Sequence, residues 1–176
     1  MDVATGEGEM PASSEDAPAN EERLRAAIGP RADYYLRHWR AMDESGKSWD
    51  WNWAACFANA YWLIFRKMWL GLILFILANI AVSAIGMAVP VLNKYTLVMA
   101  ILLTFVTGSY GNPFYRRQTR KLVASGATIE ELKRRGGTSP LALIIALVLT
   151  IALGVLAAKP ILQQIEAQRA ARLHST

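Results

Sequence analysis

The chain has 176 residues, of which 53% are hydrophobic, and a formal net charge of +5 at pH 7. This hydrophobic content is high for a soluble fold of this size, so the composition argues against an ordinary soluble domain. The single cysteine, Cys56, excludes an internal disulfide and a metal site built on a cysteine pair.

An acidic segment without hydrophobic periodicity occupies residues 1–29. Its first 22 residues hold seven acidic side chains and no basic one. Such a segment cannot bury enough apolar surface to offset the entropy lost on ordering, so we expect a disordered acidic tail. The N-terminus lacks the basic start and apolar stretch of a cleavable signal peptide, and we expect the internal spans to drive insertion.

Residues 30–67 are expected to form two short helices, one aromatic and basic and one interfacial. Pro30 suits the first turn of a helix that continues to about Met42. From residue 51 onward, aromatic and small side chains recur at alternating spacings of four and three, which places them on one side of a helix. Because Trp prefers the headgroup level and no Gly or Pro separates this segment from the first span, we expect a helix that lies on the membrane, or enters it steeply, and leads into that span. Its interfacial aromatics are Trp51, Trp53, Trp62 and Trp69.

Three uncharged runs within residues 68–158 are long enough to cross a bilayer. They cover 68–93, 95–115 and 136–158, with 26, 21 and 23 residues. A helix needs about 20 predominantly apolar residues to do so, because the hydrocarbon core is about 30 Å thick and each residue rises about 1.5 Å. The sequence therefore predicts an all-α integral membrane protein with three transmembrane helices, preceded by the interfacial aromatic helix.

The second span is expected to fray at Gly108 and Gly111. Asn112 and Pro113 then resemble a helix cap followed by a first-turn proline. They would start a basic helix that stops near Gly126, within a basic cytoplasmic loop, residues 112–139, between the second and third spans.

Two further boundaries follow from local signals. Thr128 and Glu131 have the spacing of a capping box, which predicts a short helix over 129–135. The third span is expected to end before Pro160, so that residues 159–176 form an exposed C-terminal tail.

The distribution of basic residues predicts the orientation of the chain. The loop between the second and third spans carries seven bases: Arg116, Arg117, Arg120, Lys121, Lys133, Arg134 and Arg135. The loop on the other side carries only Lys94. Because short basic loops stay in the cytoplasm, we expect a cytoplasmic N-terminus and a periplasmic C-terminus.

A row of small residues recurs at every fourth position of the third span. Its members, the small-residue row, are Ala142, Ala146, Thr150, Gly154 and Ala158. Small residues let transmembrane helices approach closely, so the row predicts a packing face. The favoured interpretation is contact with the other two spans of the same chain, and the alternative is contact with a second copy or a partner helix.

Catalytic residues, metal ligands and cofactors are not expected. The sequence shows no metal-ligand spacing, no glycine-rich phosphate loop and no nucleophile motif. The membrane runs contain no Asp, Glu, Arg or His, which argues against a pump or a coupled transporter. Nucleic acid is not expected as a partner, because the basic residues flank membrane spans.

The leading functional hypothesis is that a basic, aromatic cytoplasmic face binds anionic lipid or docks a partner protein. Its candidate residues are Arg66, Lys67, Tyr115, Arg116, Arg117, Arg120 and Lys121. The same residues would also fit a role limited to anchoring and orienting the helices. A small oligomeric channel or carrier, and recruitment of a cytosolic protein by the acidic tail, are the remaining alternatives.

Three short motifs carry a resemblance to a known family. They are WNWAA at 51–55, WLIFRKM at 62–68 and NPFYR at 112–116. Over about residues 34–124 the chain resembles a bacterial inner-membrane family, the domain of unknown function 2628. That family often has a Gly-Pro turn where this chain has residues 58–60, so the resemblance does not predict a bend there. The resemblance implies a bacterial plasma membrane, and it implies no activity.

Overall fold

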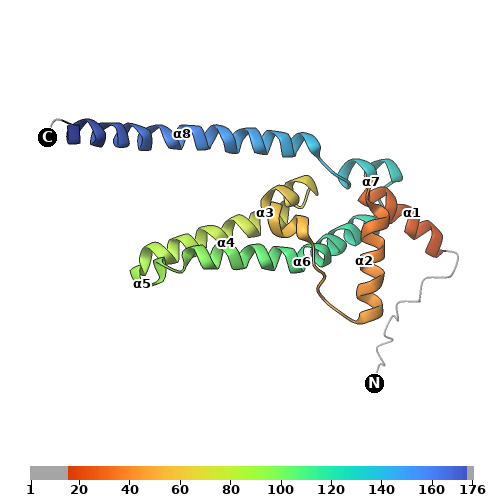
Figure 1. The fold of residues 1–176 in the computed structure, drawn as a ribbon. Coiled ribbons are helices and arrows are strands. Elements are labelled where there is room, and N and C mark those ends of the chain that lie inside the picture. The colour runs from red at the N-terminus through yellow and green to blue at the C-terminus, as the bar shows by residue number, and fades with distance from the viewer. Residues whose placement is uncertain (1–15, 174–176) are drawn as a thin grey trace, which may run out of the picture.

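The computed structural model describes residues 16–173, and within them every regular element is a helix. In chain order the helices are α1 (Asp16–Ile28), α2 (Ala32–Ser45), α3 (Trp53–Phe65), α4 (Trp69–Ala88), α5 (Pro90–Asn93), α6 (Thr96–Ala124), α7 (Ile129–Arg135) and α8 (Pro140–Leu173). Figure 1 shows α4 and α6 as a hairpin closed by α5, with α8 standing apart from it. The other end of the molecule gathers α1, α2, α7 and residues 113–124 of α6, which together we call the polar domain.

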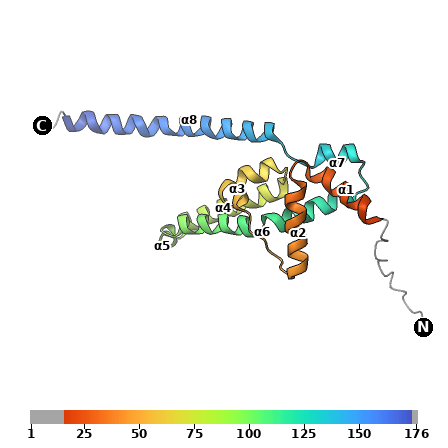
Figure 2. The same ribbon diagram turned by 45° about the vertical axis from the view of Figure 1, so that its right-hand side comes forward.

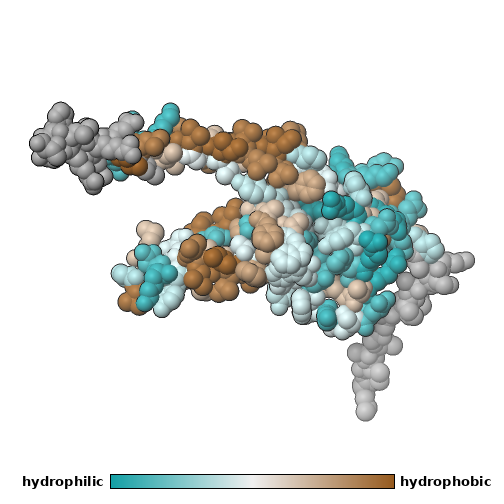
Figure 3. Space-filling model, viewed as in Figure 1, coloured by the Kyte–Doolittle hydropathy of each residue, from teal (hydrophilic) through white to brown (hydrophobic). Residues whose placement is uncertain are grey.

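Three helices, α4, α6 and α8, are long and apolar enough to cross a membrane. Most of their large apolar side chains are exposed, as expected for surfaces that face lipid. Figure 3 shows hydrophobic residues over the hairpin and α8, and hydrophilic residues over the polar domain. The prediction of an all-α, multi-pass membrane protein with a shorter aromatic helix before its spans is confirmed.

The second span continues through Pro113 into the polar domain, so the predicted break and helix cap at Asn112 are wrong. A proline inside a helix leaves the carbonyl four residues earlier without its donor. Here that carbonyl, on Ser109, accepts the backbone N–H of Asp50 at 3.1 Å, and the neighbouring Gly108 carbonyl accepts that of Asn52 at 2.8 Å. The α2–α3 connection therefore satisfies the carbonyl that proline leaves without a donor. The expected basic helix is present, but it continues the second span and does not start anew at Asn112.

Gly108 and Gly111 bring α3 close to α6 and do not mark a frayed end. A Cβ at Gly108 would lie 2.8 Å from the Cβ of Cys56, and one at Gly111 would lie 2.9 Å from the Cβ of Ala55. Such distances leave no room for a side chain. The two glycines, one turn apart, thus form the groove that holds the first turns of α3.

The second half of the predicted acidic tail is the helix α1 and is not disordered. Ile28 at its end is fully buried. Arg23 donates to the carbonyls of Val123 at 3.2 Å and Ala127 at 2.9 Å. Tertiary contacts with the end of α6 and with α7 therefore stabilise a helix that its polar composition alone would not stabilise. The first half of the predicted tail lies outside the described residues.

The aromatic helix α3 turns back against α4 and does not lead straight into it. α3 is interrupted at Asn59, with φ 19° and ψ −95°, and the chain then reverses at Lys67, with φ 55°. The N–H of Met68 donates to the carbonyl of Leu63 at 2.8 Å, and that of Lys67 to Ile64 at 3.0 Å. These are the two bonds of a Schellman motif, with lysine where glycine is usual. A lysine in the left-handed region gives no sequence signal, which is why the reversal was not predicted.

The third span, α8, continues through Pro160 to Leu173, so the predicted end before Pro160 is wrong. Its first turns approach α3, and beyond them Figures 1 and 2 show α8 separated from the hairpin. A Cβ on Gly154, in the small-residue row, would meet no atom within 4 Å. The favoured interpretation, in which this row packs against the other two spans of the same chain, is wrong.

Candidate functional site

Tyr115 and Trp62, both expected at the membrane surface, lie in the core where α3 meets the polar domain. Their side chains are almost fully buried. The Tyr115 ring packs edge-on against Tyr35 of α2 at 4.9 Å and lies 6.3 Å from the Trp62 ring of α3. This aromatic cluster joins α2, α3 and α6, and neither predicted residue is free to contact a lipid or partner at the surface.

Arg66 is also buried, with only 2% of its surface exposed. Its guanidinium lies 4.4 Å from the Tyr35 ring centroid and 5.2 Å from that of Tyr115. Nη1 donates to the carbonyl of Ile28 at 3.3 Å, at the end of α1, where the helix dipole favours a cation. Arg66 therefore helps to hold α1, α2, α3 and α6 together and does not belong to the basic surface with which it was grouped.

Lys67 fixes the turn between α3 and α4 to α7. Its Nζ donates to the carbonyl of Arg134 at 2.8 Å, and its own carbonyl accepts the side-chain amide of Gln118 at 3.2 Å. The side chain is thus engaged with the polar domain, although it remains partly exposed.

A cavity of about 410 Å³, the cationic cavity, lies beside the basic end of α6. Arg116, Arg117 and Arg120, three of the predicted residues, line it. Lys47 and Ser48 from the α2–α3 connection complete its polar wall, and nothing in the sequence around Lys47 marked it as part of a site. The predicted Lys121 is exposed on α6 and does not line the cavity.

Asp43 of α2 moderates the charge beside this cavity. Arg116 forms an ion pair with Asp43 at 2.5 Å, and a second arginine, Arg120, approaches the same carboxylate at 4.0 Å. The hydrogen bond from Arg116 lowers the pKa of Asp43 below its usual range, so the carboxylate is ionised at neutral pH. Arg116 nevertheless keeps a buried Nε without a partner among the described residues. The cavity is thus lined by four bases and has one carboxylate paired beside it, which leaves the region positive.

An apolar groove of about 220 Å³ adjoins the cationic cavity on the lipid-facing side. It lies between α4 and α6 and is lined almost entirely by apolar side chains, among them Gly71, Phe75 and Val106. Tyr110 and Phe114 line both the groove and the cationic cavity. The two spaces therefore share a wall, formed by Tyr110 and Phe114, where α6 passes from the hairpin into the polar domain.

A polar clamp holds the connection that carries Lys47 and Ser48. Asn112, fully buried, donates from Nδ2 to Asp50 at 2.5 Å and accepts at Oδ1 from Asn52 at 2.7 Å. The Asp50 carboxylate also contacts Nδ1 of His38 at 2.8 Å. Together with the backbone bonds to Ser109 and Gly108, the clamp fixes the position of the cavity wall.

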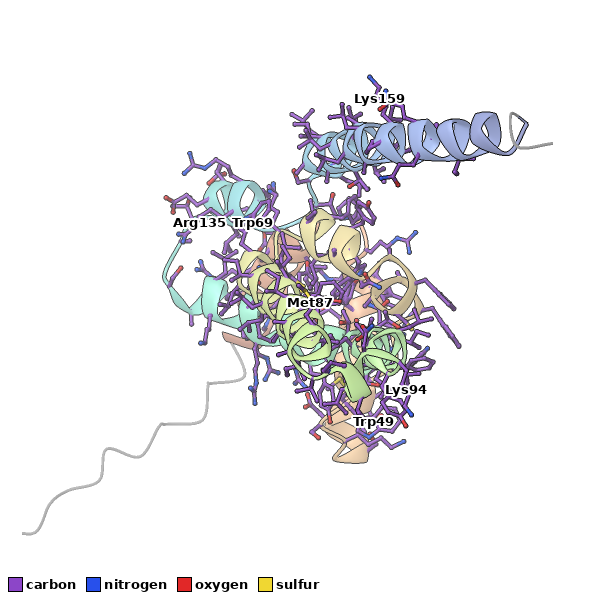
Figure 4. All side chains as sticks on the ribbon, turned by 90° about the vertical axis from the view of Figure 1, so that its left-hand side faces the viewer. Trp49, Trp69, Met87, Lys94, Arg135 and Lys159 are labelled. Atoms are coloured by element: carbon purple, nitrogen blue, oxygen red, sulfur yellow. The ribbon has the colours of Figure 1, made fainter. Side chains whose placement is uncertain are left out.

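The remaining predicted interfacial aromatics lie on the outside. Trp53 and Trp69 are 63% and 52% exposed, and Trp51 is half-buried, with its ring 5.8 Å from that of Phe105. Figure 4 views the molecule from the α5 side and labels Met87 and Lys94 at the end of the hairpin that faces the viewer, and Arg135 at the end of α7. Trp69 begins α4 at the polar-domain end of the hairpin, as an interfacial residue should.

Comparison with known proteins gives a family but no activity. No curated protein and no solved structure matches the chain. A family model described as "Protein of unknown function (DUF2628)" matches residues 19–121, which is more than half of the chain. The matched range includes α2, α3, α4 and every lining residue of the cationic cavity. The match agrees with the resemblance carried by the three sequence motifs, and the chain belongs to this family of unknown function.

Proposed function

We propose that the protein is a non-enzymatic inner-membrane protein of a bacterium that binds an anionic phospholipid at the cationic cavity. The observation that carries the proposal is the wall of Tyr110 and Phe114 shared by the cationic cavity and the apolar groove. A molecule that fills both spaces must have an anionic end and an apolar end. A phospholipid with a net negative headgroup meets both requirements, with its headgroup in the cavity and part of one acyl chain in the groove.

The charges support the same assignment. Lys47, Arg117 and Arg120 are exposed and form no ion pair within 3.5 Å among the described residues. A base near an anionic membrane surface contributes about 1 kcal/mol, so three of them together correspond to roughly a 100-fold effect on affinity. The bases of the polar domain also favour a cytoplasmic location for it, with the C-terminal end of α8 in the periplasm.

Docking of an acidic protein on the same bases is the second candidate, and the groove distinguishes the two. A protein partner would need the bases alone, whereas a phospholipid also needs space for an acyl chain. The lipid is favoured because Tyr110 and Phe114 line both spaces and the groove lies between two membrane-spanning helices.

The test measures how much phosphatidylglycerol co-purifies with the full chain, relative to phosphatidylethanolamine, by native mass spectrometry. The cavity variant is Lys47→Gln/Arg117→Gln/Arg120→Gln. The matched control, Lys133→Gln/Arg134→Gln/Arg135→Gln, removes the same charge from α7. We expect phosphatidylglycerol to fall at least tenfold in the first variant and to change less than twofold in the second. Equal losses in both would refute a specific site.

A second pair of variants tests the groove without altering charge. Ala78→Phe fills the groove, which Ala78 lines, while Ala81→Phe adds the same ring to an exposed position of α4 outside it. A lipid site predicts that only Ala78→Phe displaces phosphatidylglycerol. If neither Phe variant affects binding but the cavity variant does, the bases bind an anionic group without using the groove. That outcome would favour docking of an acidic protein over a lipid site.

A further inference from the structure

A third cavity, separate from the cationic cavity and the apolar groove, lies between α2, α3 and the start of α8. Its volume is about 300 Å³, which is within the range of small-molecule sites. Its walls are mainly aromatic, with Tyr35, Tyr61, Trp62 and Phe65, and two arginines, Arg31 and Arg66, also line it. It shares no lining residue with the other two cavities.

The buried charge of Arg66 is only partly compensated. No carboxylate among residues 16–173 forms an ion pair with it, and its Nε is buried without a hydrogen-bond partner. Its two hydrogen bonds, to Ile28 and Tyr115, both leave from Nη1 and are long, at 3.3 and 3.5 Å. Burying an ion costs several kcal/mol unless its donors are satisfied, and aromatic faces offset only about 2 kcal/mol of that. The guanidinium of Arg66, which lines the cavity, is thus left with donor capacity that no described residue satisfies.

Carboxylates are the acceptors that guanidinium groups bind most strongly, because they can accept two hydrogen bonds from one arginine. Arg31 is exposed at the mouth of the same cavity and adds a second positive charge. The aromatic walls match an apolar body, and a cavity half this size holds a benzene ring. We propose that this cavity binds a hydrophobic monocarboxylate, whose carboxylate pairs with Arg66 and Arg31 and whose apolar body lies between the aromatic rings.

Two sources supply this chemistry, a soluble aromatic acid and a fatty acid from the bilayer. The probes are therefore benzoate and octanoate, with benzamide as the uncharged analogue of benzoate. Each is titrated calorimetrically into the full chain in phosphatidylcholine nanodiscs, with empty nanodiscs as the blank. Binding of either acid, with benzamide at least tenfold weaker than benzoate or undetected, supports the proposal, and the tighter acid identifies the source. Absence of binding by both acids at 10 mM, or equal binding of benzamide and benzoate, overturns it; the 10 mM limit is about 2.7 kcal/mol of binding free energy.

Two variants outside the core locate the site. Arg31→Gln removes the exposed charge and should weaken acid binding about three- to tenfold, since a charged hydrogen bond at a partly exposed position contributes about 1 kcal/mol. Ala54→Phe fills the cavity from an exposed position of α3 and should abolish binding. Unchanged binding in both variants would overturn the proposal. So would loss of acid binding in the Lys47→Gln/Arg117→Gln/Arg120→Gln variant, which belongs to the phospholipid site and should leave this cavity unaffected.

Discussion

Replacing Asn112 by alanine should destabilise the polar domain and loosen the cationic cavity. Asn112 is fully buried, and its side chain joins the α2–α3 connection to α6 through Asp50 and Asn52. The connection carries Lys47 into the cavity wall, so the substitution tests both stability and the site.

The magnitude follows from what each partner loses. Asn52 is 3% exposed, so without Asn112 its Nδ2 remains buried and unbonded, which costs roughly 1–3 kcal/mol. Asp50 keeps its contact with His38 and is partly exposed, so its loss is only about 1 kcal/mol. We expect Asn112→Ala to lower the free energy of unfolding by roughly 2–4 kcal/mol.

Reversible unfolding in mixed micelles, followed by circular dichroism, measures this loss. A double-mutant cycle with Asn52→Ser isolates the pair, because serine keeps the N-cap bond to Ala55 and removes only the donor to Asn112. We expect the two substitutions to be non-additive by about 1–2 kcal/mol. Additivity within about 0.5 kcal/mol, or a cost for Asn112→Ala below about 1 kcal/mol, would refute the reasoning.

Two further substitutions test charge and packing. Asp43→Asn removes the carboxylate paired with Arg116, so we expect phosphatidylglycerol to bind more tightly at pH 7. The gain should be only about two- to fivefold, because Asp43 is exposed and its charge is screened by solvent. Native mass spectrometry measures it, and a fall in affinity would show that Asp43 is needed to position Arg116. Gly136→Ala places a Cβ against the carbonyl of Ala27 and, at 2.8 Å, that of Leu132. It should lower the free energy of unfolding by about 1–3 kcal/mol and speed amide exchange in α7. The control Gly154→Ala, whose Cβ would meet no neighbour, should be neutral or slightly stabilising.

Features set by local sequence were predicted correctly. The apolar runs around Leu74, Leu103 and Leu149 each exceed the bilayer thickness on their own, so no tertiary information was needed to find the three long helices. The capping box of Thr128 and Glu131 is present as predicted, because both of its hydrogen bonds lie within four residues. Such features depend on nothing elsewhere in the chain.

Features that depend on a distant partner were missed. Pro113 ends a helix in most contexts, and α6 continues only because Asp50, more than 60 positions away, donates to the carbonyl that proline leaves free. Arg66 follows an aromatic stretch and resembles a membrane anchor, yet Tyr35 and Tyr115 cover it from two other helices. The three arginines that line the cationic cavity were therefore predictable from the run of bases in the sequence. Which arginines are buried and which are exposed was not predictable, because burial depends on other helices.

The uninterrupted course of α6 has a mechanical consequence. A rod of 29 residues is about 43 Å long, and roughly 18 Å of it, after Pro113, extends beyond the bilayer side of the hairpin. Because Asp50 and Asn52 brace the point where proline would otherwise permit bending, the two parts of the rod must pivot together. A 10° change in tilt, of the kind that thinner or thicker bilayers impose, would carry the tip of this lever sideways by about 3 Å. Such a change in bilayer thickness would reach the arginines as a displacement, without any rearrangement inside the helix.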